Sequence, residues 1–481
     1  MKENNSTTHS VKWNAINSMI SQVTTIITGV VLMRILDPSA FGLIGMITVF
    51  TGFLNVLKDS GLGSSLIYQS DLKKIDKDTV FWFNISVGFI LFLGLFIFSN
   101  LIASYYDEPL LSSLTKVFSF TFILSALSQI HHVLFKKSLD FKKIFKVEVV
   151  GLVSSATLAI SAAFLGFGVW SLLVLHVSRT LIISINTWLF SNYRPAFSFS
   201  SNVLKKHFQY SFPVLGTKSF NYWTRNADNF FIGSFLGSTP LGYYSRAYFF
   251  VTMPVQKISS IIGKTLFPSL SLLKDNNEKA IVLYLKSMRM TAFVTFPLLG
   301  GLIILAKPFV LVAFGTQWLP IITTLKILCI LSLLQSVIVL TNSIYFAKGA
   351  TKLNFKLSIL SGISNIIGFY IGSQYSIEMV ATLLLSVYLL FMIPKLYYGC
   401  RLMDLNISKV IKNLSFIFMI NLLAMLVCFV FVWCVNAYLS VIYLLLLGTL
   451  LYVATFISLN ILFNRDILDE FLFSLKKVMN K

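Results

Sequence analysis

Eleven Lys and Arg residues fall within or at the edges of long apolar segments, where ionisable groups are rare. A charge at mid-bilayer costs at least ~2.5 kcal/mol even on a lenient insertion scale, so such residues are functional candidates that should face a cavity. Three acids accompany them, Asp59, Glu148 and Asp228. A cationic surplus suits an anion, whose charged oxygens can accept hydrogen bonds from Arg and Lys. The eleven are Arg34, Lys58, Lys116, Arg179, Lys218, Arg225, Arg246, Lys257, Lys264, Lys307 and Lys326.

Helical periodicity groups several of these cations. Arg246, Lys257 and Lys264 fall within about 20° of one another on a helix over 243–267, as do Lys218 and Arg225 on a helix over 209–236. The residues predicted to line a cationic cavity are Arg179, Lys218, Arg225, Arg246 and Lys257. Residues near segment ends have an alternative, because their long side chains can snorkel to the interface. Arg225 has another, a structural ion pair with Asp228 three residues later.

Polar residues form a second pattern in the first apolar segment, where they recur at spacings of three and four. Asn14, Asn17, Ser21 and Gln22 belong to this stripe, and their amides and hydroxyls suit a sugar on a cavity wall. The alternative is helix packing through interhelical hydrogen bonds. Asp59 and Asp228 are the candidates for an ion-coupling role, although Asp59 has local capping or pairing as its alternative.

Composition defines the elements that must position these residues. The chain has 481 residues, 56% of them hydrophobic and 12% charged, which excludes a soluble domain. Each span needs roughly 20 apolar residues, so the sequence predicts an all-α polytopic membrane protein with fourteen transmembrane helices. They are expected near 13–34, 41–66, 79–104, 114–134, 144–164, 170–190, 209–236, 243–267, 290–314, 320–346, 357–371, 379–394, 413–436 and 441–463.

Loop charges predict which side of the membrane each loop occupies. Alternate loops and the two ends together carry 28 Lys and Arg residues, whereas the opposite loops carry none. Under the positive-inside rule, both termini are therefore cytoplasmic. The first apolar segment is long and interrupted by polar residues, and we interpret it as a retained helix without a cleaved signal peptide.

A short internal repeat organises the chain. The turn Leu36–Leu43 resembles Leu236–Tyr243 at an offset of 200 residues, and six spans separate the two copies. An even number of spans predicts parallel repeats, as in transporters built of two parallel bundles. The expected organisation is a six-helix lobe over 1–190, a cytoplasmic linker over 191–208, a six-helix lobe over 209–400, two further helices over 401–463 and an amphipathic tail over 464–481.

Several motifs together resemble the Wzx-type lipopolysaccharide and exopolysaccharide flippases of the multidrug/oligosaccharidyl-lipid/polysaccharide (MOP) exporter superfamily. The likeness covers roughly residues 10–350 and is weaker in the last spans. It rests on the segments Leu36–Gly42, Asp59–Gly63, Leu139–Phe141, Arg225–Asn229 with Ile232–Gly233, Gly242–Tyr248, Leu266–Ser271 and Phe314–Trp318.

The resemblance implies a V-shaped, two-lobed transporter in the bacterial cytoplasmic membrane that moves undecaprenyl-pyrophosphate-linked oligosaccharide units between leaflets. Membrane lipids, a polysaccharide polymerase and chain-length machinery are the expected partners. A cation-coupled multidrug antiporter of the same fold is the alternative function, although the interior has few acids to hold cations. A membrane enzyme fits worst, because no catalytic constellation and no long outer loop is present.

Two remaining groups of residues complete the expectations. The four cysteines, and His131 with His132, lack metal-site spacing, so neither a metal nor a cofactor is expected. The basic residues gather on one side of a membrane, so no nucleic-acid partner is expected. The stretches Leu270–Met288 and Ile467–Met479 alternate lysines with apolar residues and are expected at the inner membrane surface.

Overall fold

The computed structural model describes residues 2–59, 62–69 and 71–471, and this part of the chain forms helices and turns without a strand. Twelve helices in it are long and apolar enough to cross a membrane, which confirms an all-α polytopic architecture. Two further helices, α8 and α9, are long but too polar to be counted among them. The total of fourteen spans therefore stays a prediction.

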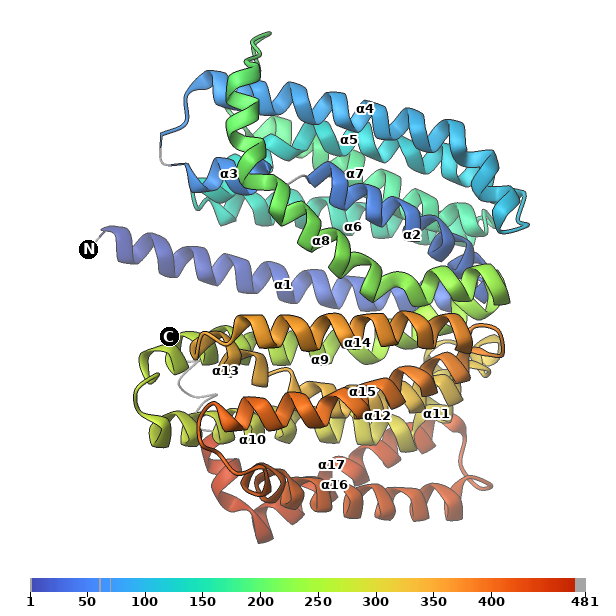
Figure 1. Ribbon diagram of the computed structural model, residues 1–481. Coiled ribbons are helices and arrows are strands. Elements are labelled where there is room, and N and C mark those ends of the chain that lie inside the picture. Colours follow the sequence, from blue (N-terminus) through green and yellow to red (C-terminus); the bar gives the residue numbers. More distant parts are fainter. Residues whose placement is uncertain (1, 60–61, 70, 472–481) are drawn as a thin grey trace. The chain divides into compact units, whose positions relative to one another are not determined.

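The chain divides into two compact units, Met1–Gly242 and Tyr243–Lys481. In the first unit, α4 packs along α5 and α6 along α7, while α1 lies against α6 and α8 against α2 (Figure 1). Its helices are α1 (Lys2–Ile35), α2 (Pro38–Asp59), α3 (Leu62–Tyr68), α4 (Lys74–Tyr105), α5 (Leu110–Lys137), α6 (Phe141–Phe164), α7 (Val169–Phe190) and α8 (Ser201–Leu236).

Small residues allow the helices of the first unit to approach closely. A Cβ atom added to Gly88 of α4 would lie 2.7 Å from the Cβ of Ala126 on α5. Helix association in lipid depends on such close van der Waals contact, because the apolar surroundings supply no hydrophobic driving force. At the start of α6, Asp140 accepts a hydrogen bond from the backbone N–H of Lys143 and caps the helix.

The second unit begins inside α9 and contains the remaining helices. Its central helix α10 packs against α12 and α16, α14 packs against α15, and α16 packs against α17. The bounds are α9 (Ser238–Leu272), α10 (Asn277–Ile304), α11 (Ala306–Ala313), the 3-10 turn η1 (Thr316–Trp318), α12 (Ile321–Ile338), α13 (Thr341–Ala347), α14 (Thr351–Gly372), α15 (Ile377–Arg401), α16 (Ile407–Val435) and α17 (Val441–Phe463).

The two copies of the repeated turn contact each other reciprocally at the end of the first unit. A Cβ on Gly42 would overlap the backbone carbonyl of Ser238, and a Cβ on Gly242 would overlap that of Pro38. Both contacts obey the 200-residue offset predicted from the sequence, since 42 and 38 correspond to 242 and 238. Glycine is needed at both positions because any side chain would collide with backbone.

The first compact unit ends at Gly242, because α8 packs on α2, α3 and α4. The predicted organisation into two lobes with a linker over 191–208 stays a prediction. The stretch Leu270–Met288 is divided among the end of α9, a turn and the start of α10, where Asn276 caps the new helix. In the tail over 464–481, residues beyond 471 lie outside the described part, and the membrane-surface placement of both stretches stays a prediction.

Candidate functional site

Glu148 of α6 is the acidic centre of a polar cluster inside the first unit. Asn17 of α1 donates a hydrogen bond from Nδ2 to Glu148 Oε2 over 2.6 Å, and its residue surface is only 9% exposed. Arg179 of α7 and His132 of α5 lie within electrostatic reach of the same carboxylate. Four helices therefore contribute to what we call the Glu148 cluster: Asn17, His132, Glu148 and Arg179.

α6 and α7 cross closely near Glu148 and Arg179. A Cβ on Gly151 of α6 would lie 3.6 Å from the backbone carbonyl oxygen of Arg179 and 2.5 Å from Cγ1 of Ile183. Glu148 precedes Gly151 by three residues, so both lie on the same face of α6. The glycine thus sets the helix separation at which the two charges interact.

Arg179 does not lie on the exposed apolar face of α7. That face carries Leu181, Ile185 and Leu189, which are 40%, 50% and 72% exposed. At 100° per residue, Arg179 is about 120° from Ile185 around the helix, although its side chain is also exposed. Among the ion pairs of the described residues, none joins Arg179 directly to a carboxylate. Its guanidinium can therefore accept an anionic ligand.

Lys218 and Asp59 form an ion pair between α8 and α2. Lys218 Nζ lies 3.4 Å from Asp59 Oδ2, and Gln129 of α5 donates to Asp59 Oδ1 over 3.1 Å. Both charged side chains are substantially exposed, at 39% for Lys218 and 60% for Asp59. The structure thus shows the local pairing considered for Asp59, while ion coupling by this residue stays a prediction.

Arg225 and Asp228 have different surroundings although they are one turn apart on α8. Arg225 is exposed, whereas Asp228 is 3% exposed and accepts a 2.7 Å hydrogen bond from the backbone N–H of Asn229. Within the described residues, no ion pair of 4.0 Å or less joins Arg225 to Asp228. Arg225 is therefore available to a ligand rather than committed to this neighbour.

Lys58 of α2 is buried and held inside the first unit instead of extending to an interface. Its side chain donates to Ser125 Oγ over 2.6 Å and to Asn55 Oδ1 over 3.0 Å. Its ammonium group also lies 5.9 Å from the Phe122 ring centroid. These neutral partners fix the charge by hydrogen bonding and cation–π attraction.

The two predicted cations of α9 belong to the second unit. The Arg246 guanidinium lies 5.5 Å from the ring centroid of Phe249, a cation–π geometry on one helix. Lys257 is exposed, and Pro254 precedes it inside the helix. The cations predicted together on α8 and α9 are thus divided between the two units, and their joint role stays a prediction.

The polar stripe of α1 lies partly in a helix interface. Asn17 and Thr28 are buried, whereas Ser21 and Gln22 are partly exposed. The side chain of Asn14 lies outside the described residues. Helix packing, the alternative considered for this stripe, accounts for Asn17, whereas a cavity-wall role stays a prediction for the other members.

The most extensive buried polar contact was not anticipated from the sequence. Asp78 of α4, 0% exposed, accepts hydrogen bonds from the Tyr193 hydroxyl at 2.5 Å, the Ser198 hydroxyl at 2.8 Å and the Ala196 N–H at 3.3 Å. Trp82 adds a bond from its indole N–H to the Ala196 carbonyl oxygen. Burial and the Asp78 carboxylate raise the pKa of Tyr193. This linker clasp fixes residues 191–200 to α4.

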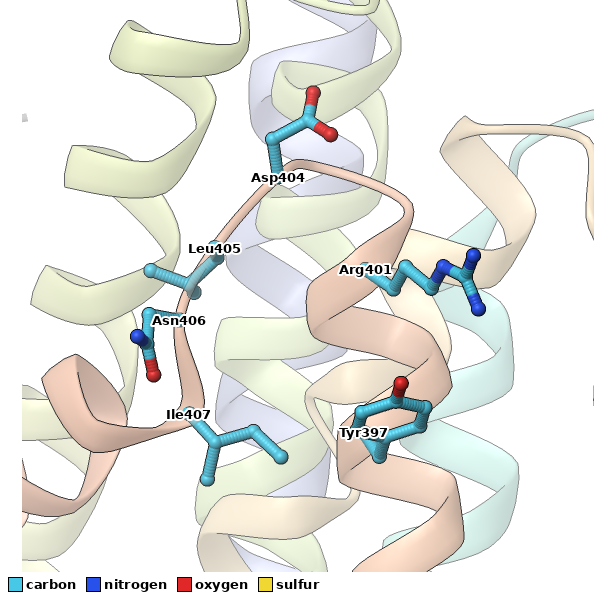
Figure 2. Close-up of a pocket in the computed structure, with 6 residues that line it drawn as sticks. All are labelled: Tyr397, Arg401, Asp404, Leu405, Asn406 and Ile407. Carbon is cyan, nitrogen blue, oxygen red and sulfur yellow. The ribbon is translucent and has the colours of Figure 1, made fainter.

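A pocket in the second unit has none of the predicted site residues in its lining. It has a volume of about 630 Å³ and is formed at the turn between α15 and α16. In Figure 2, Arg401 and Tyr397 extend from α15, whereas Asp404 points away from them at the turn. Asn277 donates to Asp404, and this contact holds the turn to the start of α10. Among the described residues, no group of three His, Cys, Asp or Glu side chains is placed to hold a metal.

Known structures define the class of fold. Lipid II flippase MurJ in an inward closed conformation matches with a TM-score of 0.77 over 94% of this chain and 99% of that chain, at 15% identity. An inward-facing multidrug resistance MATE transporter of the MOP superfamily matches with a TM-score of 0.61 over 84% and 99%, at 16% identity. The protein therefore has the fold of MOP-superfamily transporters.

Sequence comparison identifies the family within that class. Residues 31–323, more than half of the chain, match the polysaccharide biosynthesis protein family, and the chain belongs to it. Lipopolysaccharide biosynthesis protein WzxC of Escherichia coli (strain K12) is 28% identical over 76% of this chain and 74% of its own. Teichuronic acid biosynthesis protein TuaB of Bacillus subtilis (strain 168) is 29% identical over 80% of this chain and 82% of its own.

Proposed function

We propose that this protein is a flippase that moves undecaprenyl-pyrophosphate-linked oligosaccharide repeat units across the bacterial cytoplasmic membrane. The units serve the synthesis of O-antigen, capsule or exopolysaccharide. The observation that carries the proposal is the exposure of two arginines in a polysaccharide biosynthesis family member: Arg179 inside the candidate span α7, and Arg225 inside α8, whose span over 209–236 is a prediction. Charges at that depth are costly and are retained where they face a polar cavity.

The chemistry of arginine matches the invariant part of such a substrate. Sugars differ from one repeat unit to another, but the pyrophosphate always presents several anionic oxygens. A guanidinium group binds phosphate through two parallel hydrogen bonds, which gives geometric specificity as well as charge. Arg179 and Arg225 would bind the pyrophosphate, while amides and hydroxyls such as those of Gln22 and Ser21 would contact sugars.

The names of similar proteins support this substrate class. WzxC and TuaB are named for lipopolysaccharide and teichuronic acid biosynthesis, and the structural match MurJ is named for lipid II. None of these names describes an enzyme, and we propose that this chain acts as a transporter without catalysis. A polymerase and chain-length machinery on the outer side would then consume the transported units.

Deletion of the gene tests the proposal. The mutant should lose surface polysaccharide and accumulate undecaprenyl-linked repeat units in the inner leaflet, without reduced synthesis of the lipid-linked unit. If surface polysaccharide is intact and sensitivity to several cationic drugs rises, the multidrug antiporter replaces the flippase as the function.

The proposed orientation, with both termini cytoplasmic, has its own test. In a Cys434→Ser background, which removes the exposed native cysteine, single cysteines at Ser39, Ser112 and Ser238 should react with an impermeant thiol reagent from outside. Cysteines at Ser138 and Ser201 should not react. Both positions lie beside clusters of Lys residues, which the positive-inside rule places on the cytoplasmic side. The reverse labelling pattern would contradict the orientation.

A further inference from the structure

In the Glu148 cluster, the negative charge of Glu148 offsets the positive charge of Arg179. An anionic substrate bound at Arg179 would add a second negative charge near Glu148. Glu148 is held by Asn17 and lies within electrostatic reach of Arg179, while the guanidinium makes no direct ion pair among the described residues. The positive charge is therefore offset at a distance, and the face of Arg179 remains accessible to a ligand.

Few other charges reach this carboxylate from the helices packed against α6. From α7 the titratable groups are Arg179 and His176, and the His176 ring lies 5.6 Å from the ring of Phe118. From α1 the described contact is the neutral Asn17. The charge balance at Glu148 therefore depends chiefly on Arg179 and on what binds there.

The remaining neighbours are basic side chains of α5 and α6. His132 of α5 is within reach of Glu148, and Lys136 acts in turn on His132. On α6 itself, the ammonium groups of Lys142 and Lys146 lie over the rings of Trp13 and Phe190. Glu148 is thus the acid among the described groups of this cluster. The imidazole of His132 is the other group there that can bind a proton, and the Glu148→Gln variant distinguishes the two.

We propose that Glu148 takes up a proton when an anion binds at Arg179, so that substrate binding and proton binding are linked within the first unit. The inference rests on the proposed flippase function and adds the ion and the residue that regulate it. An incoming phosphate brings like charge close to the carboxylate, and two nearby anions cannot both stay ionised at low cost. Protonation of Glu148 removes that repulsion and leaves Arg179 fully available to the phosphate.

The linkage is reciprocal. If the bound anion favours protonated Glu148, then a protonated Glu148 favours the anion by the same factor. Affinity for the anion should therefore fall as the pH rises through the titration of Glu148, by up to about tenfold per pH unit when one proton accompanies each anion.

The test measures binding of inorganic pyrophosphate to the full-length purified protein by calorimetry between pH 6 and pH 8.5. The wild type should lose affinity with rising pH more steeply than Glu148→Gln, which retains an oxygen acceptor for Asn17 but cannot ionise. Titration of pyrophosphate itself is common to both proteins and cancels in the comparison. Glu148→Asp, which still ionises, should keep the steep dependence, and Arg179→Gln should lose affinity at every pH.

A second measurement avoids titration of the ligand itself. Sulfate does not titrate in this range, so proton uptake on sulfate binding, measured in buffers of different ionisation enthalpy, comes from the wild-type protein alone. Uptake approaching one proton per sulfate is expected in the wild type and should be lost in Glu148→Gln, which distinguishes Glu148 from the imidazole of His132. Glu378→Gln, which removes an acid from the first turn of α15 in the second unit, is the matched control and should behave as wild type.

Each outcome decides one of the two proposals. Pyrophosphate binding with the same pH dependence in wild type and Glu148→Gln, or sulfate binding without proton uptake, overturns the linkage and leaves the flippase proposal standing. Failure of the wild type to bind pyrophosphate at any pH counts against the anion site itself and hence against the proposed function.

Discussion

The two compact units differ in the kind of polar group that they bury. In the described part of the chain, every buried Lys, Arg, His, Asp or Glu side chain belongs to the first unit, whereas the second unit buries hydroxyls, amides and thiols. The first set is Lys58, Asp76, Asp78, His131, His207 and Asp228. The second set includes Thr252, Ser259, Thr291, Thr295, Thr324, Ser332, Ser336, Thr341, Ser343, Asn354, Ser373, Asn421 and Asn460.

Buried neutral groups and buried charges have different roles inside a membrane protein. Neutral groups such as Asn421 and Tyr452, joined by a 2.6 Å hydrogen bond, hold α16 and α17 together beside α10 at modest cost. Buried charges are costly whenever they lack partners, so they are expected where they bind a ligand, move a proton or hold a segment in place. Charge removal should therefore affect function mainly in the first unit.

The largest expected effect is loss of transport on Arg225→Ala. The substitution removes charge-assisted hydrogen bonds to phosphate, worth about 1.5–3 kcal/mol each, or about tenfold to more than a hundredfold in affinity. Arg225→Lys should restore transport only in part, because an ammonium cannot form the bidentate contact. Surface polysaccharide and membrane protein level should be measured together.

Arg465→Ala is the matched control for that prediction, since Arg465 is exposed and outside the spans. It should leave surface polysaccharide unchanged. Normal surface polysaccharide in Arg225→Ala at normal protein level would show that Arg225 does not bind the substrate. An equal loss of polysaccharide in Arg225→Ala and Arg465→Ala would show that the effect is not specific to Arg225.

Asp78→Ala should produce the largest loss of stability. Three donors in the linker clasp lose one buried acceptor, and we expect destabilisation of about 3 kcal/mol. In inverted membrane vesicles, chymotrypsin should cleave residues 191–200 faster than in wild type. Tyr193 loses its buried partner, and the segment that carries the already exposed Phe197 is released from α4. Asp71→Ala, at an exposed position before α4, should not change cleavage. Unchanged cleavage in Asp78→Ala would show that α4 does not hold the linker.

The clasp also predicts resistance to alkali. Because burial and Asp78 raise the pKa of Tyr193, the stabilisation is complete below the ordinary value of 10.0 and is lost as the pH rises through the higher folded value. Cleavage of wild-type protein should therefore stay slow at pH 10, where a free tyrosine is half ionised. Faster cleavage already at pH 9 would contradict this assignment.

A smaller effect is expected from the neutral pair of the second unit. Asn421→Ala leaves the buried Tyr452 hydroxyl without this acceptor and should lower the unfolding free energy by about 1–2 kcal/mol. Adding Tyr452→Phe to it should cost less than the sum of the single changes. Thermal unfolding in detergent measures stability, and transport per folded molecule should be unchanged. A selective loss of transport would extend function into the second unit.

The smallest effect is expected from Asp59→Asn. The Lys218 pair is exposed, and such pairs contribute about 0–1 kcal/mol. Stability and transport should both be close to wild type, with Lys218→Gln as the matched change on the other partner. If Asp59→Asn blocks transport while the protein stays folded, Asp59 rather than Glu148 becomes the candidate for ion coupling.

Sequence patterns predicted the helices better than their contacts. Apolar length predicted the all-α architecture, and the repeated turn predicted the correspondence of Gly42 and Gly242, because both properties are local. The bond from Asn17 to Glu148 joins residues 131 positions apart, and no periodicity shows which helix faces which. The linker illustrates the same limit: the sequence predicted its position over 191–208, but not that Asp78 on another helix binds residues of this segment.

The linker clasp has a consequence for the order of synthesis. Asp78 leaves the ribosome 115 residues before Tyr193, so α4 can enter the membrane long before its partner exists. During that interval the carboxylate must remain hydrated at the membrane surface, and the start of α4 cannot take its final depth. Translation of residues 191–200 then supplies three donors within a few residues. The start of α4 can therefore reach its final position only after residues 191–200, which precede α8, have been synthesised.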